Sequence, residues 1–116
     1  MADFRPFQAL RYNPAVAGNP DDLIAPPYDV VSQADRDALY ARSAYNIARV
    51  DYGADLPGDD EARNRYTRAR EQLEAWRAKG VLAKDESPTL YAYDQEFTVH
   101  GERKTRRAIF GRLRLE

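Results

Sequence analysis

The chain has 116 residues, a formal net charge of −1 at pH 7 and no cysteine. This length suffices for one domain with a modest core. The balance of acids and bases gives no general reason to expect nucleic acid or an anionic membrane as a partner. Without cysteine the chain has no disulfide, thiol nucleophile or cysteine-ligated metal. No segment reaches the roughly 20 apolar residues of a spanning helix, and the N-terminus does not resemble a signal peptide. We therefore expect a cytoplasmic protein, which the absence of cysteine also fits.

The N-terminal third is predicted to contain two short strands separated by a loop. Residues 4–12 are a β candidate, and Asn13-Pro14 followed by Gly18-Asn19-Pro20 punctuates a loop. The apolar run 23–25 is bounded by Pro26, which favours a buried or edge strand.

Two helices and a further strand are predicted in the middle of the chain. Ser32 and Asp35 form a weakened capping box that predicts a short helix over 33–42. Residues 47–52 alternate in polarity like a strand. After the acidic loop 51–61, a longer helix is expected over about 61–79.

The longer helix carries a narrow apolar seam and should end at Gly80 in a left-handed cap. We expect this helix to bury three side chains, and Val81 and Leu82 to carry the chain back into the core. The seam consists of Ala62, Tyr66, Ala69, Leu73 and Trp76, of which Tyr66, Leu73 and Trp76 are the three expected to be buried.

The C-terminal quarter is predicted to form a β-hairpin from residues 89–99 and 102–115. A three-residue loop over 99–101, with Gly101 left-handed, sets Glu96 opposite Lys104 and Asp94 opposite Arg106. The last residues still alternate where the sequence stops, so we expect a single domain that is the N-terminal part of a longer one. The predicted fold is α+β: a small mixed sheet with two packed helices and a C-terminal hairpin.

The candidate site is the stretch Pro26-Pro27-Tyr28-Asp29. Each proline fixes its own φ and restricts the residue before it, so Tyr28 and Asp29 should be held at a defined place beside a helix N-terminus. Asp29 could act as a general base or bind a hydroxyl. Alternatively, it caps a turn by accepting backbone N–H groups, and Tyr28 is a core or rim aromatic.

Three other features have both a functional and a structural interpretation. Arg5 could hold a carboxylate or phosphate, or be an ordinary surface residue. Asn46 could bind a ligand or satisfy local backbone. The only histidine, His100, is expected at the hairpin tip, without partners for a metal site. The basic residues near the C-terminus favour a salt-paired sheet over a phosphate or nucleic-acid surface: Arg103, Lys104, Arg106, Arg107, Arg112 and Arg114.

Several consecutive motifs resemble the opening of the bacterial and archaeal family known as domain of unknown function 1015. The first three are Arg-Pro-Phe-Gln-Ala-Leu-Arg-Tyr at 5–12, Ala-Pro-Pro-Tyr-Asp-Val-Val at 25–31 and Ser-Ala-Tyr-Asn-Ile-Ala-Arg-Val at 43–50. The likeness continues through Leu73–Trp76, Gly80–Leu82, Leu90–Phe97 and Thr105–Arg107, and so covers nearly all of the chain.

This resemblance implies a function only indirectly. Longer members of the family carry an Asp-Gly-His-His-Arg type motif similar to the nucleotide-binding motif of ParB-like and sulfiredoxin-like proteins. Together with a likeness to free-serine kinases of the ParB-like fold, this implies ATP- or ADP-dependent phosphorylation, with Mg, of a small hydroxyl substrate. The present sequence lacks the motif, which we expect further along a longer protein.

Under the kinase hypothesis, Asp29 is catalytic and lies near the acceptor hydroxyl, while Arg5 holds the acid group of the substrate. Pro27, Tyr28 and Asn46 complete the predicted substrate-binding set, and no metal ligands are predicted in this chain. The alternative is a non-catalytic binding or structural module. No nucleic-acid or membrane partner is expected, but the C-terminal strand could mediate self-association.

Overall fold

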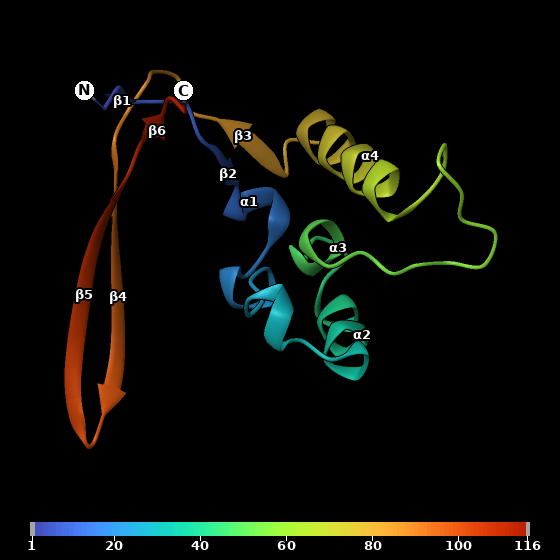
Figure 1. Ribbon diagram of the computed structural model, residues 1–116, viewed down its shortest axis with the longest axis horizontal. Helices are drawn as coiled ribbons and strands as arrows, with labels where there is room; N and C mark the ends of the chain where they lie inside the picture. Colours follow the sequence, from blue (N-terminus) through green and yellow to red (C-terminus); the bar gives the residue numbers. More distant parts are fainter. Residues whose placement is uncertain (1, 116) are drawn as a thin grey trace. The chain divides into compact units, whose positions relative to one another are not determined.

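The protein has an α+β fold, as predicted from its sequence (Figure 1). The computed structural model describes residues 2–115. Over these residues the strands form three two-stranded sheets, β1–β6, β2–β3 and β4–β5, rather than one mixed sheet. The strands are β1 (Phe4–Arg5), β2 (Leu10–Tyr12), β3 (Leu82–Lys84), β4 (Tyr91–Val99), β5 (Glu102–Phe110) and β6 (Arg112–Leu113). The helices are α1 (Pro14–Ala17), α2 (Gln33–Arg42), α3 (Ala48–Asp51) and α4 (Arg65–Ala78), with 3-10 turns η1 (Pro20–Asp22) and η2 (Tyr28–Val30).

The chain divides into two compact units. The helical unit is Arg11–Ala83, and the hairpin unit combines Met1–Leu10 with Lys84–Glu116. Helices α1 to α4 and both 3-10 turns belong to the helical unit, while β1, β4, β5 and β6 belong to the hairpin unit.

The predicted strand over 23–25 is wrong. The side chain of Asn19 accepts the N–H of Asp21 and starts η1, which ends just before Leu23. The carbonyl of Leu23 accepts the N–H of Ile47 at 2.8 Å, and that of Ile24 accepts an Asn46 side-chain N–H at 3.0 Å. These carbonyls are therefore satisfied without a strand ladder.

Helix α2 begins and ends as predicted. Ser32 and Asp35 form a complete capping box, in which each side chain accepts the backbone N–H of the other residue at 3.1 Å. The hydrogen bonds from Ser32 lower the pKa of the Asp35 carboxyl below its ordinary value. The residues that start this helix, Ser32 and Asp35, are only three positions apart, so the sequence was sufficient to predict where the helix begins.

The predicted strand over 47–52 is also wrong, because residues 48–51 form helix α3. The side-chain oxygen of Asn46 accepts the N–H of Ala48 at 2.9 Å and so satisfies a donor in the first turn. Ala48 is buried, while Ile47 and Val50 are half-buried and pack against a core cluster. The apolar residues whose alternation with polar ones suggested a strand, Ile47, Ala48 and Val50, are thus buried or half-buried by a single helical turn.

Helix α4 starts four residues later than predicted. Asn64 is its N-cap and accepts the N–H groups of Tyr66 and Thr67. The helix ends as predicted, with Gly80 at φ +75°. Of the three side chains expected inside, Trp76 is buried and Leu73 is half-buried, but Tyr66 is 70% exposed.

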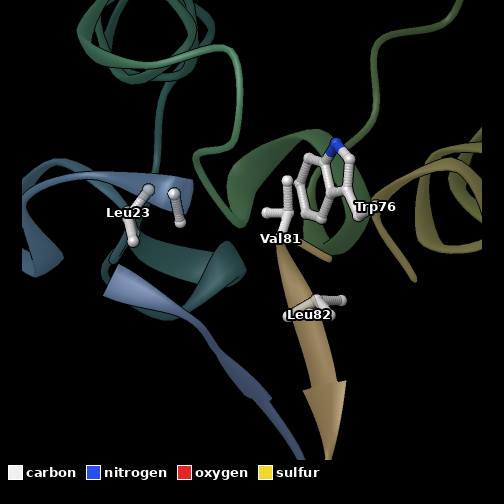
Figure 2. Close-up of a cluster of buried hydrophobic side chains, with 5 residues drawn as sticks. Leu23, Trp76, Val81 and Leu82 are labelled. Atoms are coloured by element: carbon white, nitrogen blue, oxygen red, sulfur yellow. The ribbon is translucent and has the colours of Figure 1, made fainter. Parts of the chain in front are cut away.

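The core of the helical unit is built around Trp76 (Figure 2). Figure 2 shows its indole beside Val81, and both side chains are buried together with Leu82, as the sequence predicted for the return after α4. The rings of Tyr12 and Tyr45 lie 6.1 and 6.0 Å from the indole. Burial raises the pKa of Tyr12 to about 12.

The predicted strand over 4–12 is broken into separate pairings. Pro6, which has no N–H, follows β1, and Phe7 then forms an isolated bridge with Thr89. The chain resumes pairing at β2. At the other end, β6 pairs antiparallel with β1 inside the chain, and self-association through the C-terminal strand stays a prediction.

The hairpin of β4 and β5 is present, but its register is one residue from the predicted one. His100 and Gly101 have φ values of +50° and +79°, so two residues rather than three form the loop. Positive φ at both positions is typical of a type I′ turn, whose twist matches that of the strands. Asp94 therefore lies opposite Arg107 rather than Arg106, and Glu96 opposite Thr105 rather than Lys104.

The shifted register still produces a salt-paired ribbon. Arg107 donates to Asp94 from Nε at 2.8 Å, and Arg103 pairs with Glu96. The hydrogen bond from Arg107 lowers the pKa of the Asp94 carboxyl. None of the helices within residues 2–115 has the length and apolar character needed to cross a membrane.

Candidate functional site

The candidate site centres on the proline loop, residues 24–31, whose middle is the turn η2. The Pro27 carbonyl accepts the N–H of Val30 at 3.1 Å, which closes the turn over Tyr28 and Asp29. All described peptide bonds are trans, including those of both prolines. The two prolines fix φ on the approach to this turn, as the sequence predicted.

Both ends of the proline loop are anchored in the helical unit. Val31 is 8% exposed and packs with Leu39 and Ala48, and Ala25 packs against the same cluster. Between these anchors, Tyr28 and Val30 are more than 60% exposed. The two ends of the loop are therefore held by packing, while its middle residues are exposed to solvent.

Asn46 is the residue that holds the start of the proline loop. Its side chain is fully buried and donates from Nδ2 to the carbonyls of Asp22 and Ile24, at 2.8 and 3.0 Å. Its Oδ1 accepts the N–H of Ala48. What the structure shows is thus a positioning contact to the loop, and direct binding of substrate by Asn46 stays a prediction.

Asp29 lies in the exposed middle of the proline loop. Within residues 2–115, its carboxylate makes no side-chain hydrogen bond or ion pair. Capping would require that the carboxylate accept a backbone N–H, and no such bond is present within these residues; whether Asp29 is catalytic or belongs to a structural corner stays a prediction. A free carboxylate on an anchored turn remains available to a ligand.

Tyr28 lines a cavity of about 520 Å³ that we call the tyrosine pocket. Its other lining residues come from the end of α3 and the start of α4. The full set is Tyr28, Val50, Asp51, Tyr52, Gly53, Arg65 and Tyr66. Asp29 follows Tyr28 in the same turn but is not among the described residues that line the pocket.

The tyrosine pocket contains both a positive and a negative side chain. Arg65 donates to the Tyr66 hydroxyl at 2.9 Å and lies 3.7 Å from the Asp55 carboxylate. The hydrogen bond to Tyr66 is the main cause that raises the pKa of Arg65. Asp51, at the last position of α3, is exposed, and its side chain has no hydrogen-bond or ion-pair partner within residues 2–115. Such a pocket offers groups for a ligand with both an amino and an acid function.

Gly53 gives the tyrosine pocket its shape. A Cβ at Gly53 would come within 3.2 Å of the Arg65 Cβ, which is tighter than ordinary contact. A larger residue at position 53 would require Arg65 to move by a few tenths of an ångström, so glycine suits the close approach of the chain after α3 to α4. Gly53, Asp51 and Arg65 were not predicted as site residues from the sequence. Asp51 and Gly53 belong to an acidic, glycine-containing stretch that is equally typical of a solvated loop, and Arg65 is one of several arginines along α4.

The proline loop also borders a second cavity, of about 650 Å³, which we call the apolar groove. Ile24, Pro26 and Val30 contribute from the loop, and Leu39 and Arg42 from α2. The loop therefore supplies Tyr28 to one cavity and its apolar side chains to another.

The predicted site residues fall in both compact units. Pro27, Tyr28, Asp29 and Asn46 belong to the helical unit, and Pro27 and Tyr28 are exposed. Arg5 belongs to the hairpin unit, where its Nε donates to Asp3 at 2.6 Å. A group of three or more His, Cys, Asp or Glu side chains able to hold a metal does not occur within residues 2–115.

The comparisons with known proteins place the chain in one family. No curated protein and no solved structure matches the chain. One family model matches residues 4–116, and its description is "Protein of unknown function (DUF1015)". Because this match covers nearly the whole sequence, the chain belongs to the family of unknown function DUF1015.

Proposed function

We propose that the proline loop is part of a binding site for a small hydroxyl-bearing molecule and that Asp29 orients or accepts the proton of that hydroxyl. The observation that carries the proposal is the carboxylate of Asp29. It is exposed, makes no side-chain bond within residues 2–115, and sits on a turn anchored at both ends. A general base needs a fixed position and hydrogen-bond reach to its substrate.

The tyrosine pocket supplies a place for the rest of the substrate. Tyr28 belongs both to this pocket and to the turn that carries Asp29. Arg65 can pair with an acid group and Asp51 with an amino group. An amino acid with a hydroxyl side chain combines these groups, and free serine is the simplest example.

The reaction we propose is nucleotide-dependent phosphorylation of that hydroxyl in the full-length protein. This part of the proposal rests on the resemblance of the motifs to ParB-like proteins and free-serine kinases. The residues within 2–115 include no cluster of carboxylates suited to magnesium. The chain also has no glycine-rich loop for phosphates. We therefore assign the ATP or ADP site to none of its residues.

The test compares Asp29→Asn with the wild type in the full-length protein. Nucleotide consumption with free serine is measured, together with the melting temperature. We expect an unchanged fold and a loss of turnover of about 10²–10⁴-fold, the usual contribution of a positioned general base. Asp21→Asn is the matched control, because Asp21 is also an exposed aspartate of a 3-10 turn in the helical unit. Equal turnover in wild type and Asp29→Asn would refute the catalytic role.

The second candidate is a binding module without chemistry, for which the tyrosine pocket offers Arg65 and Asp51 as charged groups that can pair with a ligand. In that case, calorimetric titration with serine shows binding that Arg65→Gln weakens, while nucleotide is not consumed. Turnover that depends on Asp29 would exclude this candidate.

A further inference from the structure

The pairing of β1 with β6 gathers charged side chains on one face of the hairpin unit. Arg5 lies directly opposite Arg112, and Arg114 donates its N–H to the carbonyl of Asp3 at 3.1 Å. Because side chains alternate along a strand, Asp3 and Arg5 share a face with Arg112 and Arg114. We call this set of four residues the arginine face.

The opposite face of the same pairing holds the register in place. Phe4 lies opposite Leu113, and its ring covers Gly111 so closely that a Cβ at Gly111 would overlap it. The Phe4 ring can occupy this position only because residue 111 has no side chain. The apolar side of the pairing thus keeps the two arginines of the other side opposite each other.

The arginine face has more positive charge than its own residues can neutralise. Arg5 Nε donates to Asp3 at 2.6 Å, which pairs the only carboxylate of the set. Arg112 and Arg114 are exposed and have no side-chain partner among residues 2–115. Like charges directly opposite in a sheet destabilise the pairing unless a counterion lies between them. A cavity of about 300 Å³ opens at these residues and is lined by Asp3, Arg5, Arg112, Leu113 and Arg114.

We propose that the arginine face is a binding site for a phosphate group. Three guanidinium groups and one carboxylate leave two positive charges, which match a phosphate dianion better than a single carboxylate. The planar guanidinium also donates two parallel hydrogen bonds to phosphate oxygens. The site lies wholly in the hairpin unit and does not depend on the role proposed for Asp29.

The chain can be titrated with sodium phosphate and, separately, with sodium chloride at matched ionic strength. Backbone amide shifts of Arg5, Arg112 and Arg114 are followed by NMR. We expect saturable shifts at these residues with phosphate only. Arg112→Gln and Arg114→Gln should each weaken binding by about tenfold, the usual loss for a hydrogen bond between charged groups.

Arg106→Gln is the matched control. Arg106 is an exposed arginine of β5, opposite Gln95, and its removal lowers the net charge equally. We expect it to leave phosphate binding unchanged. Arg112→Lys keeps the charge but loses the planar fork, so it should bind phosphate more weakly than the wild type and more tightly than Arg112→Gln.

A third titration, with ADP, separates two sources of the phosphate group. If the natural ligand is a larger phosphorylated molecule, ADP saturates the same amides at lower concentration than phosphate does. If the ligand is free phosphate, phosphate binds at least as tightly as ADP, and either result supports the site. Equal shifts in chloride and phosphate, no saturation, or equal weakening by Arg106→Gln and Arg112→Gln would overturn it.

Discussion

Arg68 holds Asp59 through two parallel hydrogen bonds. Its Nη1 donates to Oδ1 at 2.7 Å and its Nη2 to Oδ2 at 2.8 Å, and Nη2 also donates to the Ala54 carbonyl at 2.8 Å. The Leu56 N–H adds a further hydrogen bond to Asp59. The side chain of Arg68 is 25% exposed and that of Asp59 is 20% exposed. This bidentate pair ties the loop before α4 to the helix itself.

The Asp59–Arg68 pair should make the stability of the protein sensitive to acid. Hydrogen bonds from Arg68 and the Leu56 N–H lower the pKa of Asp59 from 3.8 to about 2. Since the folded-state pKa is lowered, this contribution is complete above 3.8 and is lost as the pH falls to about 2. Asp59→Asn should flatten the acid limb of a plot of unfolding free energy against pH.

Asp55→Asn is the control for this measurement. The Asp55 side chain is 77% exposed and lies 3.7 Å from Arg65, so its ion pair is weak. An acid limb that is equally steep in wild type and Asp59→Asn would show that the pair does not act in solution as the geometry implies.

Trp76→Ala should be among the most destabilising single substitutions in α4. The indole is 2% exposed and packs between Tyr12 and Tyr45, so its removal leaves a large cavity. We expect a loss of about 3–5 kcal/mol in the free energy of unfolding, measured by urea denaturation. Tyr66→Ala on the same helix should change it by less than about 0.5 kcal/mol, because the Tyr66 side chain is exposed. Similar losses from the two substitutions would contradict this placement of the core.

Substitutions of Asn46 should reveal how it holds the proline loop. Asn46→Ala leaves two carbonyls and one N–H without their partner, and should cost about 3 kcal/mol. Asn46→Asp should be at least as harmful, because a buried carboxylate oxygen would face both carbonyls in place of the donating Nδ2. Gln33→Ala, at an exposed position, is the control. Denaturation curves in which Asn46→Asp matches the wild type would show that Nδ2 does not bond these carbonyls.

The hairpin turn can be tested at both of its positions. Gly101→Ala should destabilise the hairpin by about 1 kcal/mol, because alanine is strained at φ +79°. His100→Asn should stabilise it by a few tenths of a kcal/mol, since Asn-Gly is the favoured pair in type I′ turns. Hydrogen exchange at Val99 and Glu102, which flank the turn, reports both effects. A three-residue loop would instead make His100→Asn neutral.

The sequence was sufficient wherever a short stretch contained its own structural signal. Ser32 and Asp35 define the start of α2, and Gly80 defines the end of α4, because caps involve residues only a few positions apart. Trp76 belongs to the apolar seam of α4, and Val81 and Leu82 are an apolar pair directly after its cap; burial of such side chains is favourable, and all three are buried. The α+β class and the C-terminal strand pair follow from such local signals.

The candidate site was only partly predictable. The two prolines and Asp29 could be identified as a stiff loop carrying a carboxylate, because proline acts on its own backbone. The tyrosine pocket could not, since it joins Tyr28 to Asp51 and Arg65, which are more than twenty residues away along the chain. The same holds for the arginine face, which joins the two ends of the sequence.

Tertiary contacts decided the elements whose local signals were ambiguous. The alternation of residues 47–52 suits a strand, but the buried amide of Asn46 satisfies Ala48 in a helical turn while it also bonds the carbonyls of residues 22 and 24. Tyr66 fits the apolar seam of α4 in sequence, yet α4 begins at Arg65, and Tyr66 lies in its first turn with an exposed side chain. Polar groups of the backbone must find partners wherever they are buried, and which partner is within reach depends on the folded chain as a whole.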